Sequence, residues 1–332
     1  MRLVQFVGRD GQRGVGVATD GSSELIVVQG AVAIRDLALE AHAAGTGLAA
    51  LVEARLGDAR EDYDAALAEG RVLAPIDHPD AAHCIVSLTG LTHLGSAQSR
   101  DQMHAISSNI EEGATDTMKM FQMGLEGGRP ETGAVGVQPE WAYKGDGDII
   151  VRPGADFELP GYAEDGGEEA EVAGVYVVAP AGTPLRIGFA LGNEYSDHVM
   201  EKRNYLYLAH SKLRQCSLGP ELLIGDLPLD FTGAIRVRRG DQVVWEGEMR
   251  SGDDRMCHSI ANLEHHHFKY AQFRRPGDVH IHYFGASGLS CAAGVAPQPG
   301  DVFEIDCAVF GRPLVNGLAK GEPEVRVDVT PL

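Results

Sequence analysis

The chain has 332 residues, of which 48 are acidic and 28 basic, and its formal net charge at pH 7 is −20. This charge argues against nucleic acid and anionic membranes as partners, because their phosphates would be repelled. There is no run of about 18 apolar residues and no basic segment leading into an apolar one, so we expect neither a membrane span nor a signal peptide. The five cysteines are scattered and odd in number, which is typical of reduced, buried thiols in a cytoplasmic protein.

The first 80 residues are expected to form a small N-terminal α+β domain. Residues 1–30 have the pattern of short strands joined by Gly and Asp turns. Residues 31–70 are rich in Ala, Leu and Glu with helical spacing. The linker LAPIDHPD then leads into a β-rich domain that we expect over residues 81–332.

A helical segment followed by a Gly- and Pro-containing loop occupies about residues 97–138. Such a segment at the entry to a catalytic sheet is a candidate lid. A contact between subunits is the alternative interpretation.

The pair Glu169-x-Glu171 precedes the Val- and Ala-rich run EVAGVYVV, which predicts a strand. Residues two apart on a strand point to the same face, so both carboxylates should point toward one place. Glu194 ends a second apolar run and would add a third carboxylate from a neighbouring strand. Three carboxylates suit Mg²⁺ or Mn²⁺ and leave roughly three of six positions open for water or substrate. Alternating glutamates are also typical of the solvated face of an edge strand.

Histidines form two further groups. The segment SIANLEHHHFKYAQF predicts an amphipathic helix with His267 on its apolar side and His265 and His266 exposed. His280 and His282 alternate on a predicted strand and form a rival metal pair.

From about residue 139 to 317 the chain resembles the fumarylacetoacetate hydrolase superfamily. Five elements in the family's order carry the resemblance: WAYKGDG around Lys144, Glu169-Ala170-Glu171, GNEYSDHV around Glu194, AHSKLRQCSLGPEL around Lys212, and RRPGDVHIHYFGASGLS leading into QPGDVFEIDCAVFGRPLVNG. The resemblance implies an α+β protein with a mixed, β-rich sandwich or roll. It also implies a homodimer that binds Mg²⁺ or Mn²⁺ through the three glutamates.

The departures from the family pattern bear on the reaction. Glu194 stands where the family has aspartate, and Ala286 replaces a threonine that contacts the substrate carboxylate, so Ser287 is the candidate substitute. Hydrolytic members carry a His-x-x-Glu pair that activates water, whereas here His93 has no glutamate three residues later. The chain is therefore more similar to the bacterial branch that dehydrates 2-keto-3-deoxy pentonates.

An anionic keto acid can bind only if nearby cations make the net charge of the site positive. Three carboxylates around one divalent cation leave a negative charge, so nearby cations are needed. Lys144 and Lys212, with Arg100 or Arg214, are the candidates. The alternative for each is an ordinary surface residue, which we expect most for Arg214 and least for Lys212.

The resemblance implies a metal-dependent dehydratase that converts a 2-keto-3-deoxy pentonate to 2,5-dioxopentanoate through a metal-stabilised enolate. Lys212 would bind the developing charge and Lys144 would orient the substrate. The remaining candidates are His93, Glu111 and Glu112 as general acid or base, and Arg100, Gly285 and Ser287 as substrate contacts. Glu111 and Glu112 also fit a solvated helix face. The alternatives are a hydrolase that cleaves the C–C bond of an acylpyruvate or 2,4-diketo acid, and metal-dependent binding without turnover.

Overall fold

The structure, a computed structural model, describes residues 1–93 and 115–332. Its helices are α1 (Ile34–Ala43), α2 (Leu48–Glu53), α3 (Tyr63–Ala68), α5 (Asp116–Gly127), α6 (His198–Arg203), α7 (Leu208–Lys212) and α8 (Ile260–Phe268). Within this part of the chain, no helix is long and apolar enough to cross a membrane.

Twelve described strands form one mixed sheet, whose main path runs β4-β3-β2-β1-β12-β10-β9-β15-β5-β6. Its strands are β1 (Arg2–Val7), β2 (Arg13–Ala18), β3 (Glu24–Val28), β4 (Leu56–Asp62), β5 (Cys84–Leu88), β6 (Ala142–Gly145), β7 (Ile150–Val151), β9 (Ala170–Val178), β10 (Pro184–Asn193), β11 (Cys216–Leu218), β12 (Leu222–Leu223) and β15 (Val279–Tyr283). A second sheet has the order β14-β13-β16-β17-β8. Its strands are β8 (Phe157–Leu159), β13 (Phe231–Arg239), β14 (Gln242–Ser251), β16 (Asp301–Asp306) and β17 (Leu314–Lys320).

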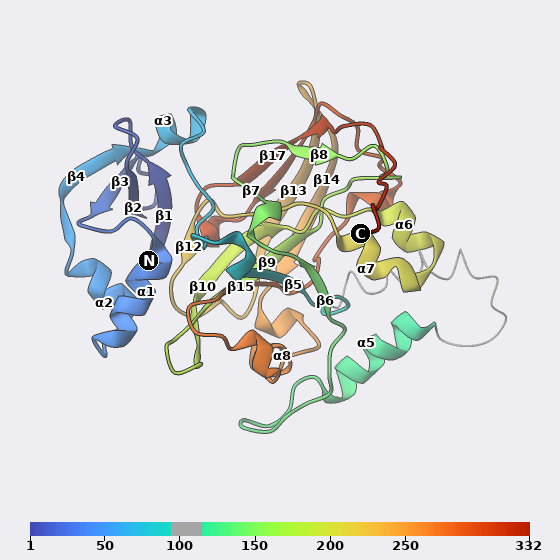
Figure 1. Cartoon of the computed structure of the whole chain (residues 1–332), viewed down its shortest axis with the longest axis horizontal. Coiled ribbons are helices and arrows are strands. Elements are labelled where there is room, and N and C mark those ends of the chain that lie inside the picture. Colours follow the sequence, from blue (N-terminus) through green and yellow to red (C-terminus); the bar gives the residue numbers. More distant parts are fainter. Residues whose placement is uncertain (94–114) are drawn as a thin grey trace.

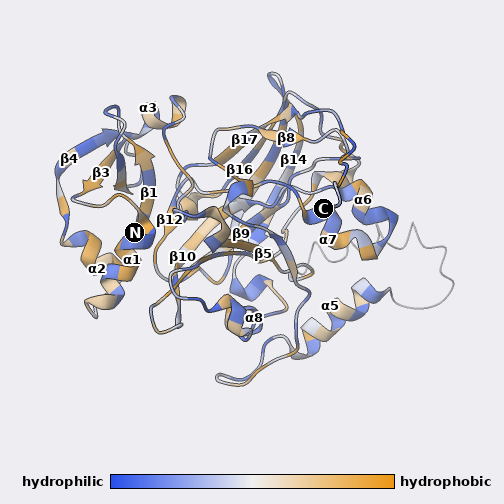
Figure 2. Ribbon diagram, viewed as in Figure 1, coloured by the Kyte–Doolittle hydropathy of each residue, from blue (hydrophilic) through white to orange (hydrophobic). Residues whose placement is uncertain are grey.

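The two sheets pack face to face around strand β9, and the expected α+β class with a β-rich core is confirmed (Figure 1). Val172 lies in a core cluster with Ile235 and Ile305 of the second sheet. Val175 points to the other face and packs in a separate cluster that includes Leu37 of α1. Because both faces of β9 are covered, its sequence is almost continuously apolar rather than alternating. Figure 2 shows hydrophobic residues along these central strands.

The N-terminal residues form one end of the molecule, and α5, α6 and α7 lie toward the other end (Figure 1). Strands β1, β2 and β3 confirm the expectation of short strands over residues 1–30. Strand β1 also pairs with β12, so these strands continue the larger sheet. The domain boundary near residue 80 remains a prediction.

The helical interpretation of residues 31–70 is wrong for Leu56–Asp62, which forms β4. This segment is polar and largely exposed, and its strand conformation comes from antiparallel pairing with β3. Pairing with a distant segment outweighed the local composition.

The histidine-rich helix is present as α8, and His267 is buried as expected. His265 is exposed, but His266 is buried, so its predicted exposure is wrong. Nε2 of His266 lies 3.0 Å from the carbonyl oxygen of Gly136, in the loop that follows α5. All five cysteines are buried and unpaired, as expected.

Candidate metal centre

Antiparallel pairing of β9 with β10 brings the three predicted metal ligands together. Ala170 pairs with Asn193, and the backbone N–H of Glu194 donates to the carbonyl oxygen of Glu169 at 3.0 Å. Glu169 precedes β9 by one residue, Glu171 is its second residue, and Glu194 directly follows β10. One carboxylate oxygen from each glutamate lies within 4.8 Å of the other two. We call these three residues the glutamate cluster; each is at most 1% exposed.

The side chain of Asn193 and the backbone N–H of Gly285 hold the glutamate cluster in place. Oδ1 of Asn193 accepts from the N–H groups of Glu169 and Tyr195, both at 3.2 Å. Oε2 of Glu171 accepts from the N–H of Gly285 at 2.7 Å. The turn at Gly285 therefore orients a carboxylate that is more than 100 residues away in sequence.

Two buried lysines face the glutamate cluster. Nζ of Lys212 contacts Glu169 and lies 2.9 Å from Oε2 of Glu194. Nζ of Lys144 forms an ion pair with the other oxygen of Glu194 and donates to the carbonyl oxygen of Lys212 at 2.9 Å. Two ammonium groups thus compensate three carboxylates, and one negative charge is left over within this group.

Burial and the excess negative charge of this group both affect the pKa of Glu171. Burial raises this pKa well above its ordinary value, and the charges of Glu194 and Glu169 raise it further. A divalent cation between the three carboxylates would reverse that effect, because it stabilises their ionised forms. The donors are all carboxylate oxygens, which suit a hard cation.

His198, Glu201 and Glu168 also belong to this region, and our sequence reasoning assigned them no role. Nε2 of His198 lies 3.2 Å from Oε1 of Glu169, and Oε2 of Glu201 lies 3.7 Å from Nζ of Lys212. Burial opposes charging of His198, but Cys291, Asp165 and Glu169 together raise its pKa well above the ordinary value. His198 follows Glu194 by four residues within the quoted GNEYSDHV motif, so proximity in sequence was the available signal.

Glu168 supports the neighbouring turn rather than the cluster itself. Its carboxylate accepts from both the N–H and the hydroxyl of Ser290, each at 2.8 Å. Burial raises the pKa of this carboxyl, and the bonds from Ser290 partly offset that rise.

His93 lies beside the turn that holds Glu171. Its Nδ1 is 3.1 Å from the hydroxyl of Thr92, and its Nε2 is 2.9 Å from the hydroxyl of Ser251. Burial lowers the pKa of His93 to about 4, so the ring is neutral at pH 7. Its predicted catalytic role remains a prediction.

The other predicted contacts divide into two groups. Ser287 lies in the same turn as Gly285, and its hydroxyl donates to the carbonyl oxygen of Ala170 at 3.2 Å. Arg100, Glu111 and Glu112 lie outside the described residues, as does the first part of the candidate lid.

The expectation that Arg214 is an ordinary surface residue is wrong. Arg214 is 6% exposed, and its Nη2 lies 3.0 Å from Oδ2 of Asp197. Asp197 also caps α6 by accepting from the N–H of Met200 at 2.9 Å. The buried pair therefore fixes the helix that carries His198 and Glu201.

His280 and His282 are buried between aromatic and polar side chains. Nδ1 of His280 lies 2.9 Å from Nε2 of His267, and Nε2 of His282 lies 2.6 Å from the hydroxyl of Thr89. Among the described residues, the glutamate cluster is the group of three or more side chains placed to share a metal. The histidine pair thus has no third ligand there.

No protein-family model and no curated protein matches the sequence. The fold is that of the fumarylacetoacetate hydrolase type, so the resemblance is confirmed at the level of the fold.

Among solved structures, the chain is similar to 2-keto-3-deoxyarabinonate dehydratase, with a TM-score of 0.70, 19% identity and coverage of 97% of this chain and 100% of that chain. A structure of 2-keto-3-deoxy-D-arabinonate dehydratase complexed with magnesium and 2,5-dioxopentanoate matches with a TM-score of 0.67 and 19% identity, covering 98% of this chain and 100% of that one. The 5-carboxymethyl-2-hydroxymuconate delta-isomerase from Mycobacterium smegmatis matches with a TM-score of 0.57 and 16% identity. The match covers 96% of this chain and 100% of that one.

Proposed function

We propose that the protein is a metal-dependent dehydratase of a 2-keto-3-deoxy sugar acid, converting a 2-keto-3-deoxy pentonate to 2,5-dioxopentanoate. The observation that carries the proposal is the buried glutamate cluster with Lys212 and Lys144 against it. The likeness to a dehydratase structure that holds magnesium and 2,5-dioxopentanoate supports this choice of substrate.

Mg²⁺ or Mn²⁺ is the proposed cofactor, held by Glu169, Glu171 and Glu194. Three carboxylates, two ammonium groups and one divalent cation leave one positive charge overall, which favours an anionic keto acid. When bound, the cation would supply Lewis acidity for the negative charge that develops as the C3 proton leaves.

The chain's own groups would position that charge and move protons. Lys212 has its ammonium group within the cluster and would stabilise negative charge on the substrate oxygens. Lys144 would hold Glu194 and help to orient the substrate. His93 is neutral at pH 7 and could accept a proton, although a pKa of about 4 makes it a weak base. Glu111 and Glu112 remain the other candidates for proton transfer.

The alternative is hydrolysis of an acylpyruvate or a 2,4-diketo acid. That reaction needs a base that activates water, and the family's His-x-x-Glu pair is incomplete because Ser96 stands three residues after His93. His93 instead lies between the hydroxyl groups of Thr92 and Ser251. These features favour the dehydratase.

The test is turnover of both enantiomers of a 2-keto-3-deoxy pentonate, and of acetylpyruvate, with Mg²⁺ and with EDTA. We expect 2,5-dioxopentanoate from one enantiomer and no product in EDTA. Glu171→Gln should reduce the rate at least about 100-fold, since it removes a ligand charge. Glu53→Gln, at an exposed glutamate that ends α2, is the control and should be unchanged. Pyruvate and acetate from acetylpyruvate, with the sugar acids unchanged, would establish the hydrolase instead.

Metal binding can be tested without turnover. Saturating Mg²⁺ at about 100 times its Kd stabilises the folded protein by about 2.7 kcal/mol, so EDTA should lower the melting temperature by several degrees. Glu171→Gln should lose most of that difference, whereas Glu53→Gln should keep it. A melting temperature that responds equally in both variants would place the metal elsewhere.

A further inference from the structure

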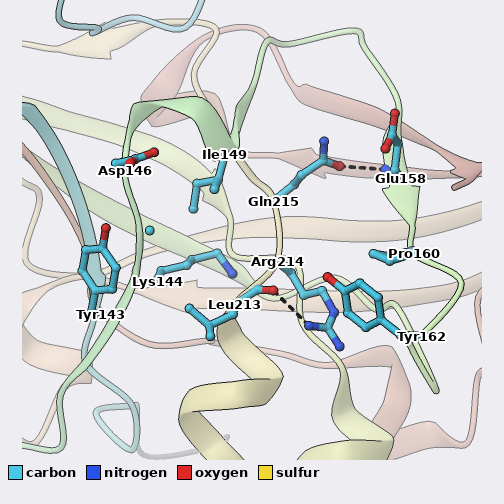
Figure 3. A pocket seen from close by; sticks show the side chains of 11 residues that line it. Tyr143, Lys144, Asp146, Ile149, Glu158, Pro160, Tyr162, Leu213, Arg214 and Gln215 are labelled. Atoms are coloured by element: carbon cyan, nitrogen blue, oxygen red, sulfur yellow. Dashed lines mark hydrogen bonds between the residues drawn. The ribbon is translucent and has the colours of Figure 1, made fainter. Parts of the chain in front are cut away.

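A cavity of about 390 Å³ opens beside the metal centre. It lies between the turn after β6, the loop after β8 and the residues after α7 (Figure 3). Its volume is within the range of small-molecule sites, roughly 300 to 1,000 Å³. Among the described residues, its wall includes none of the glutamate cluster, although Lys144 contributes to both. The cavity is therefore a neighbour of the metal centre and not part of it.

Two tyrosines from different segments form opposite sides of this cavity (Figure 3). Tyr143 is 45% exposed and Tyr162 is 52% exposed, so both rings present surface to an occupant. Cζ of Arg214 lies 5.0 Å from the centre of the Tyr162 ring, and Asp197 holds the same guanidinium. The guanidinium of Arg214, which Asp197 holds, thus packs against the Tyr162 ring and also lines the cavity.

The polar groups of the wall include both donors and acceptors. Oε1 of Gln215 accepts from the N–H of Glu158 at 2.7 Å, which leaves the side-chain NH₂ of Gln215 to donate (Figure 3). Burial and the charge of Asp146 raise the pKa of Tyr143, so its hydroxyl keeps the proton that it can donate. The carboxylates of Asp146 and Glu158 are the acceptors.

Charge decides which class of molecule fits. Each cation of the wall has its own carboxylate, Arg214 with Asp197 and Lys144 with Glu194. Asp146 and Glu158 have no ion pair in the described part of the chain, so the cavity carries excess negative charge and repels anions. An ammonium group would bond to these carboxylates, but it accepts no hydrogen bond and would leave the NH₂ of Gln215 and the hydroxyl of Tyr143 without an acceptor. A neutral molecule whose hydroxyl groups both donate and accept matches the whole set.

We propose that this cavity binds a neutral sugar or polyol, with the carbon skeleton packed against Tyr143 and Tyr162 and the hydroxyl groups bonded to Gln215, Asp146 and Glu158. The site is distinct from the metal centre and takes an uncharged molecule, whereas the proposed substrate is an acid. The two proposals can therefore fail independently.

The test uses the full chain and a charge series of matched shape: D-glucose, D-glucosamine and D-glucuronate, with D-xylose and L-arabinose as smaller neutral sugars. Binding is measured by saturation-transfer NMR and by calorimetric titration up to tens of millimolar, in EDTA so that turnover does not contribute. We expect at least one neutral sugar to bind. Tyr162→Ala and Gln215→Ala should each weaken it by about tenfold or more. Tyr270→Ala removes a similarly exposed tyrosine outside this cavity and should leave binding unchanged.

Three results would overturn the proposal. The first is that no neutral sugar binds at tens of millimolar. The second is that glucuronate or glucosamine binds more tightly than glucose. The third is that a sugar binds equally well to the wild type and to both cavity variants. The circular dichroism spectrum and melting temperature of each variant show whether it is folded. If Tyr162→Ala does not fold, the comparison of Gln215→Ala with Tyr270→Ala decides.

Discussion

Lys212 is surrounded by three carboxylates and has no exposed side-chain surface. Burying an ammonium group is costly unless opposite charges lie close to it, and burying clustered carboxylates is costly for the same reason. Lys212 and the glutamate cluster therefore depend on each other for stability before any substrate is bound. These ion pairs also connect the helix that ends at Lys212 with the strands that carry the glutamates.

Lys212→Met tests this dependence. Removing the ammonium leaves uncompensated buried carboxylates, and we expect the free energy of unfolding to fall by at least about 3 kcal/mol in EDTA. Mg²⁺ should restore part of the loss, because it supplies positive charge at the same place. Urea unfolding with and without Mg²⁺ measures both effects, and the exposed Lys320→Met is the control. A loss no larger than that of Lys320→Met would contradict the charge argument.

Buried neutral histidines should make the protein sensitive to acid. Burial lowers the pKa of His267 to about 4 and that of His280 to about 3, whereas an unfolded chain titrates near 6.5. Between these values the unfolded state binds more protons, so stability is lost as the pH falls below about 6.5. His267→Phe should flatten the dependence of the unfolding free energy on pH by up to about 1.4 kcal/mol per pH unit near pH 5.

Urea unfolding at neutral pH and near pH 5 gives that slope. His42→Asn, at an exposed position, should have the wild-type slope. An unchanged slope in His267→Phe would mean that this ring does not stay neutral in the folded protein.

Among the elements, the turn at Gly285 links strand β15 to the glutamate cluster. Gly285 has a φ of 100°, in the left-handed region that favours glycine. A Cβ there would overlap the hydroxyl of Thr92 and approach the carbonyl oxygen of Thr89 to 2.9 Å. The turn can therefore keep its N–H on Glu171 only if residue 285 is glycine.

Gly285→Ala should displace this turn and weaken Mn²⁺ binding by about 10- to 100-fold, as expected when a group that orients a metal ligand is lost. Gly294→Ala is a matched control, because Gly294 also has a positive φ of 76° but has open space around it. It should cost about 1 kcal/mol of stability and leave metal affinity unchanged. Electron paramagnetic resonance of Mn²⁺ measures the affinity. Equal affinities in both variants would show that the turn does not hold the ligand.

For the molecule as a whole, Glu221 connects the N-terminal strands to the remainder of the chain. Its carboxylate is 2% exposed and accepts from Nε of Arg2 at 2.6 Å, the hydroxyl of Tyr63 at 3.1 Å and the N–H of Arg312 at 3.0 Å. These three donors come from the first strand, the third helix and the C-terminal part of the chain. Together with the pairing of β1 and β12, Glu221 joins the N-terminal strands to the main core.

Glu221→Ala should lower the free energy of unfolding by about 3 kcal/mol, because it leaves buried donors without an acceptor. Asp20→Asn removes the other carboxylate partner of Arg2, but that partner is 88% exposed, so the change should cost less than about 0.5 kcal/mol. Guanidinium unfolding followed by fluorescence measures both. Similar losses in the two variants would mean that Glu221 acts as an ordinary surface charge.

The sequence predicted the β-rich class, the first three strands, the histidine-rich helix and the grouping of Glu169, Glu171 and Glu194. These features follow from the alternation of polar and apolar residues and from apolar runs, which are patterns among neighbouring residues. The nearness of Glu169 and Glu171 also follows locally, since they are two residues apart in an extended segment. Glu194 joins them because β10 pairs with β9.

Other features depended on contacts between distant segments. Strand β4 is polar and exists because β3 lies beside it. Arg214 is buried because Asp197 meets it from another loop, and Gly285 reaches Glu171 across more than 100 residues. His198 contacts Glu169 because Gly167 pairs with Ser196 and brings the start of α6 beside the residue that precedes β9. A charged side chain can be buried wherever a partner is placed against it, and the position of that partner follows from the three-dimensional packing of the chain and not from neighbouring residues.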